Sequence, residues 1–157
     1  MFEIKIEDQA VMSALGRLAQ AGRDMSPVMR KIETEMFVQT EANFAAEGRP
    51  KWLGLKNPSE RRKGGQILQD TGQLAASISS SSDATSATVG SNKVYAAIHQ
   101  LGGKAGRGHK ATIPARPFLP VDAQGNLQPE AEDLILGIAN NYLAKLIGGF
   151  NSEVQLL

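Results

Sequence analysis

Hydrophobic and polar positions predict a strand and a first helix at the start of the chain. Phe2, Ile4 and Ile6 alternate with charged residues, which is the period of a strand that buries one face. Apolar side chains then recur at helical spacing, and Gly22 is expected to end this first helix. The apolar stripe of the helix consists of Val11, Leu15, Leu18 and Ala19.

A second, longer helix is predicted to begin at Ser26 and Pro27. The Ser26 hydroxyl can accept hydrogen bonds from the free N–H groups of the first turn, and a proline at the first helical position has no N–H to leave unpaired. The helix should end near Gly48, because Pro50 disfavours helical backbone at Arg49. Its apolar stripe comprises Val28, Met29, Ile32, Met36, Thr40 and Phe44.

The middle of the chain predicts a long loop followed by a small antiparallel sheet. Residues 49–73 are rich in Gly, Pro and charge, which favours an extended excursion with one helical turn. Residues 74–81 and 84–91 then read as two strands joined by a turn near Ser82–Asp83, and 94–98 as a third strand. The Gly-rich basic stretch 101–112 is expected to be a loop or a disordered tip.

Prolines and a final helix dominate the last third of the chain. Residues 113–120 hold three of the seven prolines, so this segment is an edge or an extended docking segment and not a central strand. A helix is predicted from Pro129, whose first turn carries acids that suit the positive end of the helix dipole, to Gly148–Gly149. Its expected buried face consists of Leu134, Ile135, Ile138, Tyr142, Leu146 and Ile147.

This order of elements predicts a single α+β domain, in which a small antiparallel sheet packs with two or three helices and carries long basic loops. We place the domain at residues 1–150 and a C-terminal tail at 151–157. The start of the chain lacks the basic and apolar regions of a signal peptide, and no apolar run approaches the roughly 20 residues that span a bilayer. A membrane partner is therefore not expected.

Charge is distributed unevenly, although 17 basic and 16 acidic residues leave a net charge of +1. Residues 49–117 carry eleven basic side chains against three acidic ones, and both flanks are acidic. Three interpretations stay open at this point. The bases of 49–63 and 104–116 contact nucleic acid, or they form a solvated loop surface, or they dock the acidic helices of a neighbouring subunit.

Candidate chemistry is sparse. The chain has no cysteine, and its two histidines, His99 and His109, lack the spacing that places two metal ligands on one helix face. Residues 106–111 match a Gly-rich dinucleotide motif formally, but extended chain follows where a helix is needed. We therefore predict no catalytic residues, no metal, no cofactor and no small-molecule substrate. Trp52 beside the basic cluster is either an interface anchor or a residue that pins its loop onto the core.

Four segments, in this order, resemble the phage virion morphogenesis family, the tail-completion proteins of contractile-tailed phages. They are PKWLGL (50–55), ILQDTGQLAASI (67–78), VGSNKVYAAIHQLGG (89–103) and IPARPFLP (113–120). The residues that match the family pattern are Trp52, Leu68, Thr71, Gly72, Leu74, Ser77, Ile78, Tyr95, Ala96, Ile98, His99, Gln100, Gly102, Gly103 and 113–119. The resemblance covers roughly residues 1–147.

The resemblance implies a non-enzymatic phage or prophage protein that completes the tail and helps it join the filled head. It implies a homo-oligomeric ring at the neck or the head-proximal end of the tail, with other tail and neck proteins as partners. The protein is then expected in the virion, and in the host cytoplasm during assembly. Beside this resemblance, docking between subunits explains the charge distribution better than DNA contact, which stays as the alternative function.

Two groups of residues follow from these arguments. The candidates for assembly contacts are Trp52, Arg61, Arg62, Lys63, Lys104, Arg107, Lys110, Arg116 and Phe118. The residues expected to shape the family's structural motif are Gly72, Tyr95, His99, Gln100, Gly102 and Gly103. Within the motif we expect the glycines to permit tight turns, Tyr95 to fill the core, and His99 and Gln100 to support the glycine turn by hydrogen bonding.

Overall fold

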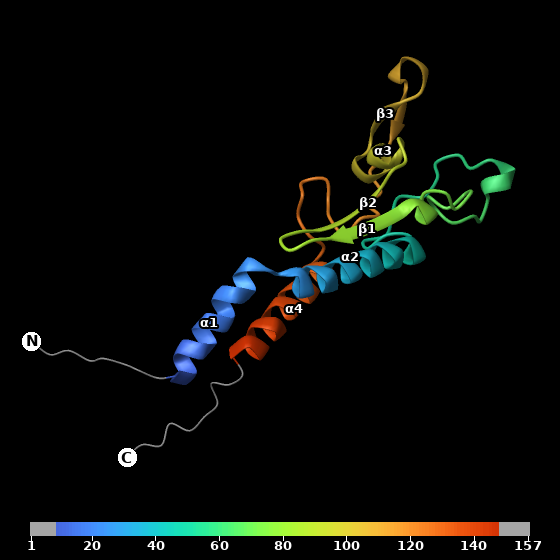
Figure 1. Ribbon diagram of the computed structural model, residues 1–157. Coiled ribbons are helices and arrows are strands. Elements are labelled where there is room, and N and C mark those ends of the chain that lie inside the picture. Colours follow the sequence, from blue (N-terminus) through green and yellow to red (C-terminus); the bar gives the residue numbers. More distant parts are fainter. Residues whose placement is uncertain (1–8, 148–157) are drawn as a thin grey trace, which may run out of the picture.

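The computed structural model describes residues 9–147, which form an elongated α+β molecule (Figure 1). The four helices are α1 (Gln9–Arg23), α2 (Ser26–Ala46), α3 (Ala96–Leu101) and α4 (Pro129–Ile147). Two two-stranded antiparallel sheets pair β1 (Ile78–Ser82) with β2 (Ala87–Ser91) and β3 (Gly103–Ala105) with β4 (Ala111–Ile113). The predicted fold class is confirmed. The strand expected at Phe2–Ile6 and the glycine stop at 148–149 lie outside the described residues.

Figure 1 shows how these elements are arranged along the long axis. Helices α1 and α4 lie side by side at one end, and α2 extends from them with the β1–β2 hairpin along its length. The β3–β4 hairpin projects from the body, and the loop around the short 3₁₀ turn Glu60–Arg62 forms a separate protrusion. The two hairpins and this loop therefore offer surfaces that are distinct from the helical end.

Helix α2 begins and ends close to the predicted positions, but its start is capped differently. Ser26 is already the first helical residue, and its N–H and hydroxyl both donate to Oδ1 of Asp24, at 2.9 and 2.5 Å. The prediction that Ser26 caps the helix is therefore wrong, because the Asp24 carboxylate supplies the acceptor at this turn. At the other end Glu47 adopts left-handed backbone and Gly48 donates its N–H to Asn43 O at 2.8 Å.

The predicted β1–β2 hairpin is confirmed, with Ile78 opposite Ser91 and Ser82 opposite Ala87. Its first strand is shorter than expected, because Ala75–Ser77 form a 3₁₀ turn. The hairpin is fixed to α2 by the carboxylate of Glu33, which accepts hydrogen bonds from the hydroxyls of Ser80 and Ser82 at 2.9 and 2.5 Å. A serine-rich strand of low hydrophobicity is thus attached through polar contacts.

Two predictions for residues 94–112 are wrong. The expected third strand at 94–98 is a turn leading into helix α3, which accords with the good helix propensity of its alanines. The expected loop at 101–112 contains the β3–β4 hairpin, in which Gly103 pairs with Ile113 and Ala105 with Ala111. Glycines with positive φ, such as Gly106 at +78°, allow the chain to turn between these two short strands.

An aromatic cluster forms the centre of the core. The Phe44 ring stacks on Phe118 at 5.4 Å between centroids and meets the Trp52 indole edge-on at 6.0 Å. Leu74 and Ala96 complete the cluster of buried residues. The core therefore joins α2, the 49–53 loop, the proline segment and α3 at one place.

The apolar faces of α1 and α4 only partly match the prediction. In α1 Ala14 and Ala21 are buried, whereas Leu15 is 54% exposed. In α4 the one fully buried residue is Ala131, and Ile147 of the predicted buried face is 41% exposed. Small side chains therefore occupy buried positions of both helices, and several larger ones face water.

Candidate functional site

Gln100 holds the proline segment by a set of hydrogen bonds to its backbone. Its Oε1 accepts the N–H groups of Phe118 and Leu119 at 2.9 and 3.0 Å, and its Nε2 donates to Val121 O at 2.7 Å. In addition, the Arg116 N–H donates to the carbonyl of His99 at 2.7 Å. The side chain of Gln100 thus acts on the proline segment and not on the glycine turn that we expected it to support.

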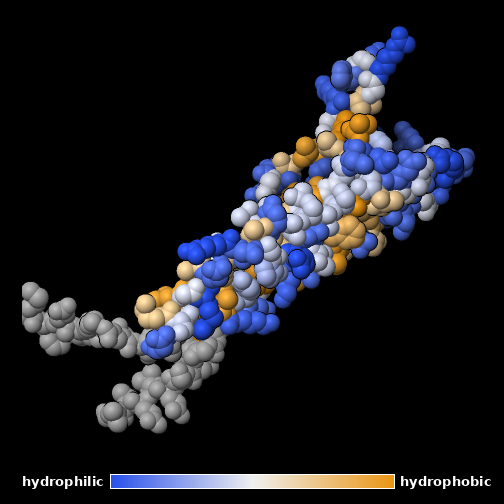
Figure 2. All heavy atoms as spheres, viewed as in Figure 1, coloured by the Kyte–Doolittle hydropathy of each residue, from blue (hydrophilic) through white to orange (hydrophobic). Residues whose placement is uncertain are grey.

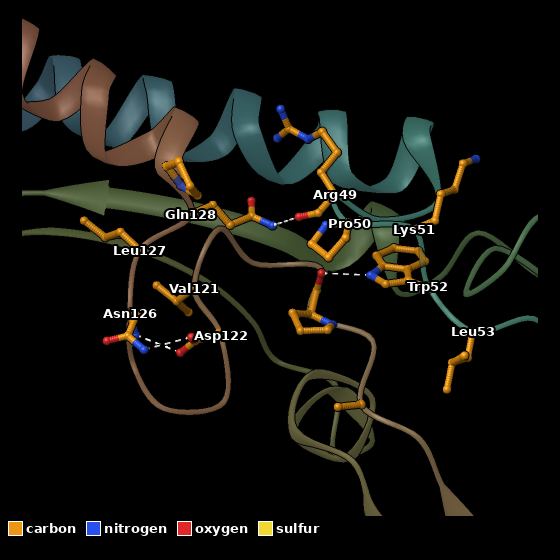
Figure 3. Close-up of a pocket in the computed structure, with 13 residues that line it drawn as sticks. Arg49, Pro50, Lys51, Trp52, Leu53, Val121, Asp122, Asn126, Leu127 and Gln128 are labelled. Atoms are coloured by element: carbon orange, nitrogen blue, oxygen red, sulfur yellow. Dashed lines mark hydrogen bonds between the residues drawn. The ribbon is translucent and has the colours of Figure 1, made fainter.

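A second polar group joins α2 to the start of α4, and Figure 3 shows its hydrogen bond between Gln128 and Arg49. The buried Asn43 donates from Nδ2 to Gln128 Oε1 at 2.9 Å and to Phe118 O at 3.1 Å, and its Oδ1 accepts from Arg49 Nε at 2.9 Å. Gln128 Nε2 in turn donates to Arg49 O at 2.6 Å. Sequence patterns did not indicate this group, because a single Asn in a helix or a Gln before one gives no sign of distant partners.

The cavity drawn in Figure 3 lies between the 49–53 loop and residues 121–129 and has a volume of about 380 Å³. Trp52 forms one wall, is 8% exposed and donates from Nε1 to Pro117 O at 3.0 Å. Trp52 therefore pins its loop onto the core, while an additional role at an interface stays a prediction. The polar groups around this cavity bond to one another, as Asn126 and Asp122 do, and they form no catalytic set.

Arg116 and Phe118, two of the candidates for assembly contacts, are buried. Phe118 is 1% exposed, and Arg116 is 6% exposed. The guanidinium donates to the carbonyls of Leu53 and Gly54 at 2.9 and 3.2 Å, and among the described residues no carboxylate lies within ion-pair distance of it. Burial lowers the pKa of Arg116 from its ordinary value.

The other basic candidates separate into two groups. Arg61 makes a two-pronged ion pair with Asp70, both contacts at 2.6 Å, and Lys63 pairs with Glu60. The hydrogen bond from Arg61 lowers the pKa of the Asp70 carboxyl. Arg62 also contacts Asp70, at 3.4 Å.

The second group lies on the β3–β4 hairpin. Lys104, Arg107 and Lys110 are exposed there, and the tip of the projecting hairpin is strongly hydrophilic (Figure 2). The structure therefore does not bring the basic residues together into one continuous patch, since the hairpin and the 60–63 loop project separately (Figure 1).

The motif glycines adopt positive φ, with Gly72 at +70°, Gly102 at +73° and Gly103 at +147°. At Gly102 a Cβ atom would lie 2.8 Å from the backbone nitrogen of Ala115, so no side chain fits. The expectation that Tyr95 fills the core is wrong. Its side chain is 37% exposed and meets the His99 ring edge-on at 6.1 Å.

An uncovered apolar stripe on the helical end was also missed by the sequence analysis. On α4 the exposed residues Leu136, Leu143 and Ile147 follow one another at intervals of seven and four, with the exposed Asn140 between them. On α1, Met12 is 61% exposed and Leu15 is 54% exposed. The 3–4 spacing along α4 could have revealed the stripe, but Leu136 and Leu143 were given no role and Ile147 was assigned to the buried face.

Within residues 9–147 the structure contains no group of three His, Asp or Glu side chains that could hold a metal ion. In the same part of the chain no helix has both the length and the apolar character of a membrane span.

Comparison with known proteins defines the class of this chain. Residues 6–144 match the phage virion morphogenesis family, so the chain belongs to this family of phage virion-assembly proteins. The chain is 46% identical over 148 residues to a Haemophilus influenzae protein named Mu-like prophage FluMu G protein 2, covering 94% of this chain and 99% of that one. It is also 29% identical over 134 residues to the putative capsid assembly protein G of Escherichia phage Mu, covering 78% and 85%. No solved structure matches the chain.

Proposed function

We propose that this protein is a non-enzymatic subunit that completes the phage tail and helps join it to the head. In this proposal it forms a homo-oligomeric ring at the neck or at the head-proximal end of the tail, in contact with other tail and neck proteins. The support is its membership of a virion morphogenesis family, together with a phage Mu relative whose name describes capsid assembly. It acts in the virion, and in the host cytoplasm while particles assemble.

The observation that carries the assembly role is the uncovered stripe on α4. Leu136, Leu143 and Ile147 are 54%, 45% and 41% exposed, and water contact with side chains of this size is unfavourable. Their spacing, with Asn140 between them, is that of the a and d positions along which two helices pack, and a polar residue at one such position fixes register. We assign the stripe to a second copy of this chain.

Charge supports a head-to-tail contact between copies. The exposed bases of the hairpin, Lys104, Arg107 and Lys110, have no carboxylate within ion-pair distance among the described residues. The exposed acids of the first turns of α4, Glu130, Glu132 and Asp133, lie on a different part of the molecule. Unlike surfaces on separate parts of one subunit make a heterologous contact, which is the kind that closes a ring.

The alternative function, DNA binding through 49–63 and 104–116, receives no support from the comparisons. The geometry also weighs against it, because Arg61 and Lys63 are already paired with Asp70 and Glu60. A phosphate would have to displace these carboxylates before it gained either base.

Deleting the gene from the phage or prophage that encodes it tests the proposed function. We expect filled heads and separate tails in electron micrographs, and restoration of joined particles when the gene is supplied from a plasmid. Joined, infectious particles from the deletion would overturn the proposal. Labelling the complemented particles with an antibody locates the protein, and label on the baseplate or on the capsid surface would contradict a position at the neck.

A further inference from the structure

We infer that a cavity beside Arg116 binds the carboxylate side chain of a protein partner. The cavity has a volume of about 270 Å³ and is distinct from the one behind Trp52. It is lined by residues from each of the four segments that carry the family resemblance, among them Leu55, Thr71, His99 and Arg116. Segments far apart in the sequence thus contribute to one concave surface.

Positive charge is the main electrostatic feature of this cavity. Arg116 is 6% exposed and is held by two backbone carbonyls, with no acidic partner among residues 9–147. A buried guanidinium is stabilised when a carboxylate supplies the opposite charge, because neutral carbonyls compensate only part of its lost hydration. Arg62 adds a second positive charge to the lining.

The acid already in the lining does not meet this need. Asp70 accepts two hydrogen bonds from Arg61 at 2.6 Å and a longer one from Arg62. Arg61 itself does not line the cavity. Its charge is therefore balanced by Arg61, and Arg62 and Arg116 leave the cavity positive. A carboxylate entering beside Arg116 offsets one of these two positive charges.

His99 provides a second, independent observation. Its Nδ1 is buried and has no hydrogen-bond partner, which is costly for a polar atom and marks an incompletely satisfied site. Burial, and then the charge of Arg116, lower the pKa of the imidazole. The exposed Tyr95, whose ring packs edge-on against His99, adds a hydroxyl group to the lining.

The chemistry favours a glutamate side chain over a phosphate. Leu55, Leu68 and Leu74 give the cavity apolar walls that suit the methylene groups of a glutamate stem. A phosphate carries more charge and would need more donors than Arg116 and Arg62 provide. In the setting proposed above the glutamate belongs to another virion-assembly protein, and that identification of the partner rests on the proposed function.

NMR of the isolated protein tests the site without requiring assembly. In the His109→Gln variant His99 is the single histidine, so its ring resonances report its pKa directly. We expect N-acetyl-glutamate N-methylamide to bind with a dissociation constant on the order of 10 mM and to raise the pKa of His99, because an anion nearby favours the imidazolium. The neutral glutamine analogue at the same ionic strength should leave this pKa unchanged.

Equal responses to the two analogues, no response to the glutamate one, or an equal response to inorganic phosphate would each overturn the inference. Arg116→Lys tests the residue itself, since it retains the charge but loses the planar fork, and binding should weaken at least threefold if the variant stays folded. If the Arg116 variant does not fold, Tyr95→Phe provides a second test at an exposed position. Its glutamate binding should weaken too, and full binding by Tyr95→Phe would exclude the tyrosine hydroxyl from the site.

Discussion

The side chain of Gln100 is hydrogen-bonded to the backbone of Phe118 much as a neighbouring strand would be. Its Oε1 accepts the buried Phe118 N–H at 2.9 Å and also the N–H of Leu119, while its Nε2 donates to Val121 O. The proline segment has few N–H groups to give to a sheet. One glutamine on α3 accepts two of them, and the N–H of Arg116 donates to His99 O. Phe118 is thereby held in the core against Phe44.

Replacing Gln100 with methionine keeps the length of the side chain but removes all three hydrogen bonds. We expect the free energy of unfolding to fall by about 2–4 kcal/mol, because buried N–H groups are left unsatisfied. Urea denaturation followed by circular dichroism measures the loss. Gln20→Met, at an exposed position of α1, is the matched control and should change stability by less than about 0.5 kcal/mol. Equal stability of the two variants would contradict the role given to Gln100.

Gly48 and Gly137 should respond to alanine in opposite directions. At Gly48 the backbone has φ of +96°, and a Cβ would lie 2.6 Å from Trp52 Nε1 and 2.7 Å from Pro50 O. Gly48→Ala should therefore lower the free energy of unfolding by more than about 2 kcal/mol. Gly137 lies within α4, and a Cβ there would have open space around it. Gly137→Ala should therefore raise the free energy of unfolding by about 0.5–1 kcal/mol, because alanine has the higher helix propensity. Thermal unfolding of both variants measures the two signs.

Leu143→Lys should prevent self-association without unfolding the chain. Leu143 is 45% exposed, so a lysine there faces water in the monomer but puts a charge into the proposed contact between copies. We expect sedimentation velocity to show at least a tenfold weaker association and circular dichroism to show an unchanged fold. Asn141→Lys adds the same charge to α4 outside the stripe and is the control. Association of Leu143→Lys equal to that of the control would exclude the stripe as the contact.

Glu33 should make the attachment of the β1–β2 hairpin sensitive to pH. Hydrogen bonds from Ser82 and then Ser80 lower the pKa of its carboxyl below the ordinary value of 4.5. A carboxyl with a lowered pKa stabilises the fold above the unfolded-state pKa, and this contribution is lost as the pH falls through the folded-state value. The urea midpoint should thus drop less between pH 6 and pH 3 in Glu33→Gln than in the parent protein.

Residual acid sensitivity of Glu33→Gln should come from other carboxyls with a lowered pKa. In the part of the chain that the structure describes, these are Asp24, Asp70, Asp83 and Asp122. Glu41→Gln, an exposed position on the same helix, is the control for the loss of one charge from α2. A pH dependence of Glu33→Gln as steep as that of the parent would show that the serine contacts are not formed in solution.

Local patterns in the sequence were sufficient to place α2, α4 and the β1–β2 hairpin. Pro27 and Pro129 mark helix starts by a backbone property of proline itself, and Gly48 marks a helix end by the conformation that it alone tolerates well. Residues 94–98 were misassigned because a short apolar run fits either a strand or a helix until its neighbours are known.

The sequence by itself thus determined the limits of α2, the start of α4 and the first hairpin, since each depends on residues close together in the chain. It also identified the family, through four segments that follow one another in order. The tertiary structure alone decided which faces are buried and which charges are paired. Ala14 and Ala21 are buried where Leu15 was expected, and this depends on how α1 packs against the rest of the fold. Arg61 is neutralised by Asp70, whereas the buried Arg116 has no acid within ion-pair distance among residues 9–147. A count of charges along the sequence cannot distinguish these two arginines. Such pairings depend on distances across the fold, which nearby sequence does not encode.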